Sequence, residues 1–581
     1  MPRRTPMNKQ SRIYKQCASA CLAVLILWFC CPLTSNAGEV GEASESIKKG
    51  DDLSAAGRFQ DAIVEYTKAI DLSPQDAAPY VERAVCIIYA TGQAKQALAD
   101  IDKAISLKPD YARAYAARCG IYRALGFYNK SITNAKKAVE LGYSRPSSDD
   151  PIQIMRYAAL ENGLGNHNEA HQLYEQALNS IGRKDDSASA FQRGMAYNAL
   201  GRWQDSIAET NRGSQLESDN IQFVYMRAVA LARSGHDQEA LKDYDRCIKS
   251  LPNNPLMIRS RSYSYWNLTQ YEKALQDCNR ALELLPDYPD ALGMRASIYQ
   301  ELKHSKEAIN DYIQVASMTH QPEYAFWGRA KVYQSMGDDR RSKEALDQAV
   351  ALDPNSPDIL LDRARWYIAH RDLLPALADL NRAIPLSPAR HELWAQRGYV
   401  NDLLSKWKDA EADLNKSLAL TPNCPRCLLN RAWARKESGD TKGEQSDLDA
   451  VIKTQSDLSK AYFDRAGWYR EQKEYQKAID DDTMALKYNP KFAQAYCSRG
   501  CNYWHLGQNA KAIQDCSEAI SLDPHRTHSF FTRGSSYRKI GKLNLALQDL
   551  NTAIKQDPNY KQARDERDLI LKDLRNHRHT Q

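Results

Sequence analysis

The chain has 581 residues, of which 43% are hydrophobic and 26% are charged. This balance supports folded cores along the chain, and it argues against long disorder and against a polytopic membrane protein. The net charge of +6 comes largely from five basic residues near the N-terminus, and the rest of the chain is nearly neutral. Charge therefore gives no reason to expect nucleic acid or an anionic membrane surface as a partner.

Residues 1–37 have the features of an export signal. Five basic residues precede an uncharged, mostly apolar run over residues 17–33, and Ser35 and Ala37 are the small residues that signal peptidase prefers. We expect cleavage after Ala37 and a protein body that is exported, either periplasmic or secreted. The alternative is an uncleaved N-terminal membrane anchor, because a run of about 17 residues is the lower limit for spanning a bilayer.

An arginine recurs every 34 residues through most of the chain, without any insertion or deletion. Such strict register indicates a repeat architecture, in which each unit is one supersecondary element. The eleven positions are Arg193, Arg227, Arg261, Arg295, Arg329, Arg363, Arg397, Arg431, Arg465, Arg499 and Arg533.

One unit, residues 493–524, shows the repeat pattern most completely. Aromatic, small and turn-forming residues stand at fixed places in it: Tyr496, Gly500, Tyr503, Ala512, Ala519 and Pro524. This pattern resembles the tetratricopeptide repeat. The resemblance implies two antiparallel helices per unit, packed closely where small side chains let the backbones approach. It also implies that the units stack into a right-handed superhelical solenoid.

About fifteen such units cover nearly all of the mature chain and give an all-α fold. In chain order, we predict an array of three repeats over residues 43–142, an irregular polar linker over residues 143–151, and a regular array of twelve repeats over residues 152–558. The linker suggests a hinge between the two arrays. Residues 559–581 are highly charged and suit a capping helix and tail.

Most of the repeated arginines have an acidic residue sixteen positions later, and Ala345 is the exception. We predict a structural ladder of arginine–carboxylate pairs between helices, because a half-buried charge needs a partner and these groups pair bidentately. The alternative is a row of unpaired arginines that binds a polyanion. The pairs taken to represent the ladder are Arg227 with Asp243, Arg261 with Asp277, Arg499 with Asp515, and Arg533 with Asp549.

The family resemblance implies a concave groove lined by the first helix of each unit. Exposed aromatic rings among charges of both signs suit an extended peptide or a partner helix, and we expect about half of the groove rings to be exposed. The predicted groove residues are Tyr263, Trp266, Trp327, Tyr399, Trp433, Phe463, Trp504 and Phe531.

Cys424 and Cys427, in the sequence CPRC, lie at the start of a predicted helix and resemble a redox pair. A single CxxC outside a thioredoxin-like βαβ pattern instead favours a structural disulfide or an unpaired turn pair. Zinc is not expected, because no second CxxC or histidine pair occurs at suitable spacing. No P-loop, nucleophile elbow or dinucleotide motif occurs. We therefore expect no enzyme activity, no cofactor and no metal site.

These observations favour a non-enzymatic scaffold that binds proteins or peptides in the groove of a repeat superhelix outside the cytoplasm, with no nucleic acid as partner. Attachment to a membrane through residues 17–33 is the alternative to a free exported protein. A second hypothesis is an envelope protein that binds carbohydrate or an anionic polymer through groove aromatics and unpaired arginines. A third is a thiol oxidoreductase that uses Cys424 and Cys427.

Overall fold

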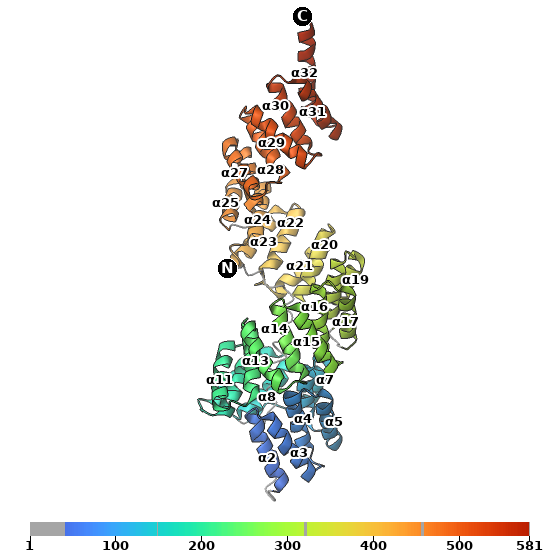
Figure 1. Cartoon of the computed structure of the whole chain (residues 1–581), viewed down its shortest axis with the longest axis vertical. Helices are drawn as coiled ribbons and strands as arrows, with labels where there is room; N and C mark the ends of the chain where they lie inside the picture. The colour runs from blue at the N-terminus through green and yellow to red at the C-terminus, as the bar shows by residue number, and fades with distance from the viewer. Residues whose placement is uncertain (1–40, 148, 319–321, 455–457, 580–581) are drawn as a thin grey trace. The chain divides into compact units, whose positions relative to one another are not determined.

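A computed structural model describes residues 41–579, apart from residues 148, 319–321 and 455–457 (Figure 1). Within this part of the chain there are thirty-one α-helices and no strand. Consecutive helices pack in fifteen pairs and one further helix follows them, which confirms the predicted all-α repeat fold. The predicted export signal, residues 1–37, lies outside the described residues. None of the helices in the described part has the length and apolar character needed to cross a membrane.

The chain divides into two compact units, which we call unit 1 (Met1–Pro354) and unit 2 (Asn355–Gln581). The described part of unit 1 holds nine helix pairs: α2 (Glu42–Ala55) with α3 (Phe59–Leu72), α4 (Ala77–Thr91) with α5 (Ala94–Leu107), α6 (Ala112–Ala124) with α7 (Tyr128–Glu140), α8 (Pro151–Leu164) with α9 (His167–Ile181), α10 (Ser187–Ala199) with α11 (Trp203–Leu216), α12 (Ile221–Arg233) with α13 (Asp237–Ser250), α14 (Pro255–Asn267) with α15 (Tyr271–Leu284), α16 (Pro289–Glu301) with α17 (Ser305–Met318), and α18 (Glu323–Ser335) with α19 (Asp339–Leu352).

The described part of unit 2 holds six helix pairs and a final single helix. They are α20 (Pro357–Ala369) with α21 (Leu373–Leu386), α22 (His391–Leu403) with α23 (Trp407–Leu420), α24 (Pro425–Ser438) with α25 (Thr441–Lys453), α26 (Leu458–Glu471) with α27 (Tyr475–Tyr488), α28 (Ala493–His505) with α29 (Asn509–Leu522), α30 (Thr527–Lys539) with α31 (Leu543–Gln556), and α32 (Lys561–His579). Helix α32 packs on α31 and α30, and its Ala563 and Ile570 are buried in the last core cluster.

Small residues lie where the two helices of a pair cross. In the pair α28–α29, Ala512 and Ala519 are fully buried. A Cβ atom added to Gly500 would lie 2.8 Å from Cys516 Sγ and 3.3 Å from the carbonyl oxygen of Ala512. The helix axes therefore approach too closely for a larger side chain at this position, because packed interiors do not absorb added volume cheaply.

The polar segment that follows the third repeat is irregular over residues 143–147 and 149–150, and Pro151 is the first residue of α8. The carboxylate of Asp150 caps this helix by accepting a hydrogen bond from the backbone N–H of Ile152 at 2.9 Å. The hinge expected at residues 143–151 thus lies inside unit 1, where repeats before and after it share one core. The division into compact units falls after Pro354 instead.

Unit 1 curves back on itself, so that its first three repeats contact its sixth, seventh and eighth repeats. Within this unit, the first helices, blue in Figure 1, lie beside green helices that follow much later in the chain. We call these contacts the seam. Three hydrogen bonds cross it: Asn220 Nδ2 to the carbonyl oxygen of Ala56 (2.9 Å), Asn254 Nδ2 to the carbonyl oxygen of Tyr89 (3.3 Å), and Tyr128 Oη to Asp290 Oδ1 (3.2 Å).

Aromatic rings fill the space behind the seam. The rings of Phe59 and Phe191 lie 6.0 Å apart between centroids, and those of Phe191 and Phe223 lie 5.5 Å apart, both in edge-to-face geometry. These three residues come from α3, α10 and α12 and are almost fully buried. Repeats that are distant in sequence therefore share one hydrophobic core, which a simple row of repeats would not provide.

Substitution of the glycine that follows α4 tests how much the seam contributes to stability. Gly92 has a φ of +70°, and an added Cβ would lie 2.6 Å from Pro255 Cδ and 2.9 Å from Asn254 Oδ1. Replacing it by alanine should cost about 2–4 kcal/mol, from backbone strain plus displacement of the seam. Urea denaturation of the purified protein would measure this loss.

Gly235 provides the matched control. It has a φ of +86°, but no atom lies within 4 Å of an added Cβ. Gly235→Ala should therefore cost only the strain of about 1–2 kcal/mol. Equal losses in the two variants would show that the seam contributes nothing to stability.

Candidate partner-binding surface

The first helix of each pair lies on the inner side of the curve within each unit. Successive first helices contact one another, as α22 does with α24 and α28 with α30, whereas the corresponding second helices do not do so to a comparable extent. Helices that converge lie on the inside of a bend, so the first helices form the concave face. Polar side chains bridge neighbouring first helices on this face: Lys436 Nζ to Glu471 Oε1 (2.6 Å), Arg470 Nη1 to Ser498 Oγ (3.0 Å) and Arg538 Nη1 to Glu566 Oε1 (3.1 Å).

The repeated arginines lie between helices and contact carboxylates. Nine of them donate two hydrogen bonds, from Nε and Nη2, to the aspartate sixteen residues later, at 2.6–2.9 Å. Arg193 pairs with Glu209 at 2.9 Å. All four ladder pairs named from the sequence are bidentate, namely Arg227 with Asp243, Arg261 with Asp277, Arg499 with Asp515, and Arg533 with Asp549.

Most of these arginines also contact the preceding repeat, which the sequence reasoning missed. In eight of them Nη1 donates to the residue sixteen positions earlier, on the second helix of the previous pair, at 2.6–3.1 Å. We call this arrangement the arginine clamp. The signal was present in the sequence as a polar residue at every one of these positions: Asn211, Asp245, Asn279, Asn381, Asn415, Asp449, Thr483 and Ser517.

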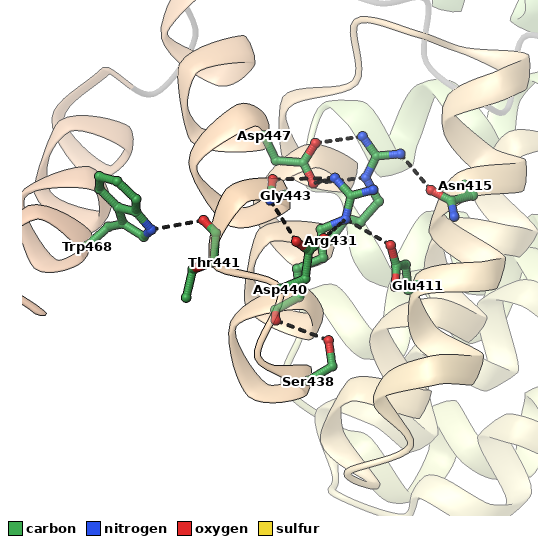
Figure 2. Close-up of polar contacts among 10 residues, drawn as sticks. Glu411, Asn415, Arg431, Ser438, Asp440, Thr441, Gly443, Asp447 and Trp468 are labelled. Carbon is green, nitrogen blue, oxygen red and sulfur yellow. Dashed lines mark hydrogen bonds and ion pairs between the residues drawn. The ribbon is translucent and has the colours of Figure 1, made fainter. Parts of the chain in front are cut away.

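The clamp at Arg431 fixes the rotation of α24 (Figure 2). Asp447 accepts hydrogen bonds from Arg431 and also from Arg435 Nη1 at 2.9 Å, while Arg435 Nε contacts Glu411 at 2.8 Å. Trp433 lies two residues from each arginine, which is about 200° around a helix. With both arginines held against the second helices, Trp433 projects to the opposite side, and 57% of its surface is exposed.

The other predicted groove rings are less exposed than expected. Tyr263, Trp266 and Trp327 are buried, with 4–5% of their surface exposed, and only Trp433 belongs to the exposed class. The remaining four, listed here, are half-buried: Tyr399, Phe463, Trp504 and Phe531. The expectation that about half are exposed is therefore wrong. The physical reason is that neighbouring first helices converge, and large rings fill the space between them. Tyr263 and Trp266, for example, share a core cluster with residues of the next first helix.

Arg329 is the one repeated arginine that faces alanine, Ala345, where the others face an acid. Its guanidinium lies 5.3 Å from the ring centre of Phe326 and 5.9 Å from that of Tyr333. Its Nε is buried without a hydrogen-bond partner among the described residues. The row of arginines is otherwise neutralised by carboxylates, so it does not form the open cationic track that binding of an anionic polymer would require.

Models of one family match six segments along the chain. Tetratricopeptide repeat models match residues 47–112, 260–288, 289–319, 328–391, 493–526 and 527–560. The chain is a multi-repeat tetratricopeptide repeat protein. No curated protein sequence matches it significantly.

Solved structures of other repeat proteins are similar to parts or most of the chain. The Cut9–Hcn1 hetero-tetramer of the APC/C is 13% identical and covers 95% of this chain and 100% of its own, with a TM-score of 0.41. The TPR domain of P58(IPK) is 17% identical over 62% of this chain and 99% of its own, with a TM-score of 0.30. The first TPR of Spaghetti (RPAP3), bound to an HSP90 peptide, is 26% identical over 20% of this chain and 94% of its own, with a TM-score of 0.20.

A buried carboxyl group belongs to the same helix pair, α24–α25, as the exposed Trp433 of this tetratricopeptide repeat protein. Glu444 on α25 occupies the repeat position that Ala512 has in α29, and it is only 5% exposed. Burial is the main cause that raises the pKa of Glu444 to about 7; Lys436 opposes the shift, and the neighbouring carboxylates of Glu471 and Asp464 contribute to it. The interior of the pair α24–α25 therefore contains a carboxyl group whose pKa lies near neutral pH.

The first prediction from this surface concerns the clamp. Arg261→Ala leaves Asp277 buried without its bidentate partner, and should destabilise unit 1 by about 2–4 kcal/mol, since an uncompensated buried charge is costly. Amide hydrogen exchange should show faster exchange across α14 and α15. Arg329→Ala is the matched control, because position 345 holds no carboxylate, and it should cost about 1 kcal/mol. Equal exchange rates in the two variants would contradict a stabilising role for the pairs.

The second prediction concerns Glu444. The unfolded chain releases this proton near pH 4.5, whereas the folded chain holds it to about pH 7. Between these pH values the folded state binds the additional proton, so stability should fall by about 1.4 kcal/mol per pH unit as pH rises. Glu444→Gln should remove this dependence and make unit 2 about 2 kcal/mol more stable at pH 8.

Unfolding midpoints measured between pH 4.5 and 8 would test this expectation. Glu518→Gln, which removes an exposed carboxyl group on α29 of the same unit, should leave the pH dependence unchanged. A Glu444→Gln profile that overlays the wild-type profile would contradict the assignment.

Proposed function

We propose that the protein is a non-enzymatic scaffold that binds an extended peptide or a partner helix along the concave face of unit 2. The observation that carries this proposal is the exposure of Trp433 on a first helix whose rotation is fixed by Arg431 and Arg435. A large ring held rigidly in solvent costs little entropy to immobilise on binding, and tryptophan is the side chain most enriched among binding hot spots.

Charges of both signs surround this anchor. Lys436 pairs with Glu471 on the next first helix at 2.6 Å, and Lys460 pairs with Asp464 one turn along α26. Such pairs at a surface contribute little to stability, so a partner can displace them at low cost. An apolar anchor flanked by exchangeable charges favours a peptide whose register is fixed by polar contacts.

The arrangement of the chain also supports a scaffold rather than an enzyme. Repeats occupy nearly all of the described residues, and each contributes surface for contact with other molecules. We further propose that the scaffold acts outside the cytoplasm, on the basis of the charge and hydropathy pattern of residues 1–37.

Affinity purification from the native cell, after crosslinking, tests the scaffold proposal. Trp433→Ala should reduce recovery of a specific protein partner at least about tenfold, because truncating a hot-spot tryptophan typically costs 2 kcal/mol or more. Leu374→Ala is the matched control, since Leu374 is an exposed apolar residue on the second helix α21 of the same unit. Partners recovered equally with wild type and with Trp433→Ala would place the interface elsewhere. Recovery of glycan in place of protein would favour the carbohydrate hypothesis.

A further inference from the structure

Two cysteines and a histidine come together in unit 2, and we call them the Cys–His cluster. It consists of His391, Cys424 and Cys427, each of which offers one ligand atom within 4.8 Å of the other two. His391 is the first residue of α22, whereas Cys424 is the N-cap residue of α24, one repeat later. The sequence expectation of no zinc ligands considered only local spacing, and it overlooked that the 34-residue repeat places the starts of neighbouring first helices side by side.

The imidazole of His391 has a ring nitrogen available to bind a metal ion. Its Nδ1 is buried and has no hydrogen-bond partner among the described residues. Its Nε2 lies 3.8 Å from the carboxylate of Glu392. A buried ring nitrogen with no partner is costly unless something binds it.

The two sulfur atoms also lie where they can bind a metal ion. Cys424 Sγ accepts a hydrogen bond from the backbone N–H of Cys427 at 3.3 Å, at the N-terminus of α24, where the helix dipole favours negative charge. Cys427 Sγ lies 3.4 Å from Ser417 Oγ and is almost fully buried, whereas Cys424 is half-buried. One sulfur is thus accessible from solvent and the other is held in the interior.

The structure holds these two cysteines as a disulfide, with Cα atoms 5.3 Å apart. A dithiol reductant supplies two electrons and two protons to this bond, becomes a disulfide itself, and yields two thiols. A metal ion then displaces both thiol protons and binds the two thiolates. Reduction therefore makes two thiolates available to a metal ion, and oxidation removes them.

We propose that the reduced Cys–His cluster binds one soft or borderline divalent metal ion of the zinc class. Two thiolates and one imidazole are the ligands that Zn²⁺ prefers, and three protein ligands leave a fourth position for water or for a group from a partner. The site is independent of the peptide-binding proposal, because it lies at the starts of α22 and α24 and does not include Trp433.

Titration of the reduced full-length protein with Co²⁺, as a spectroscopic probe for Zn²⁺, tests the proposal. We expect one Co²⁺ per chain, a sulfur-to-cobalt charge-transfer band in the near ultraviolet, and displacement of Co²⁺ by Zn²⁺. The disulfide form should bind none. Absence of the band in the reduced protein would overturn the proposal.

Variants assign the ligands. Cys424→Ser should abolish the charge-transfer band while preserving α24, because serine is itself a favourable N-cap residue. His391→Ala should weaken binding about tenfold or more, since it removes one of three ligands. The double variant Cys497→Ser, Cys501→Ser removes another closely spaced pair of buried cysteines, and should bind Co²⁺ like wild type. Binding that survives Cys424→Ser, or that is unchanged in His391→Ala, would overturn the assignment.

Discussion

The arginine clamp is the interaction on which the arrangement of repeats depends. In a solenoid each repeat contacts mainly its neighbours, so the orientation of one repeat on the next must be specified locally. Hydrophobic packing of small residues tolerates sliding, whereas a planar guanidinium with a bidentate pair of hydrogen bonds to one helix and a third bond to another does not. Each clamp joins three helices across the boundary between repeats. Its recurrence at eight positions of the 34-residue register keeps these boundaries alike.

Fixing helix rotation determines which side chains reach solvent. A residue two positions from a clamped arginine lies on the opposite side of its helix, where Trp433 is exposed. The same position in an earlier repeat holds Tyr263, which is buried. The difference comes from neighbours, because Tyr263 packs with residues of the next first helix, whereas Trp433 does not belong to any of the described core clusters. Repeat position thus sets the direction of a side chain, and the adjoining repeat sets its exposure.

Much of this could be read from the sequence, since the repeat pattern is local and strict. The helix pairs, the small residues at their crossings and the carboxylate partners of the arginines follow from the 34-residue register. The seam could not be predicted, because it joins Asn220 to Ala56 across 164 residues. Whether these residues meet depends on the pitch of the curve, and that pitch is the sum of small rotations at every boundary between repeats. The prediction of how many groove rings are exposed failed for a related reason, because their exposure depends on how far neighbouring first helices converge. The Cys–His cluster needed only the register, applied across two repeats.

One position in the repeat shows how a regular scaffold acquires special properties. Asn220, Asn254 and Cys424 all cap the N-terminus of a first helix and occupy the same place in the 34-residue register. Each side chain accepts a hydrogen bond from its own helix, and the two asparagines then use their remaining amide protons to bond across the seam. A cysteine at this position caps the helix through sulfur and has no amide to donate, so it cannot bridge to a distant turn. Its sulfur is instead a reactive group at a helix N-terminus, beside the start of the preceding first helix. In either case the N-cap side chain accepts a hydrogen bond from its own helix, and its other atoms remain available. In unit 1 these atoms hold the seam together, and in unit 2 the sulfur is available for thiol chemistry.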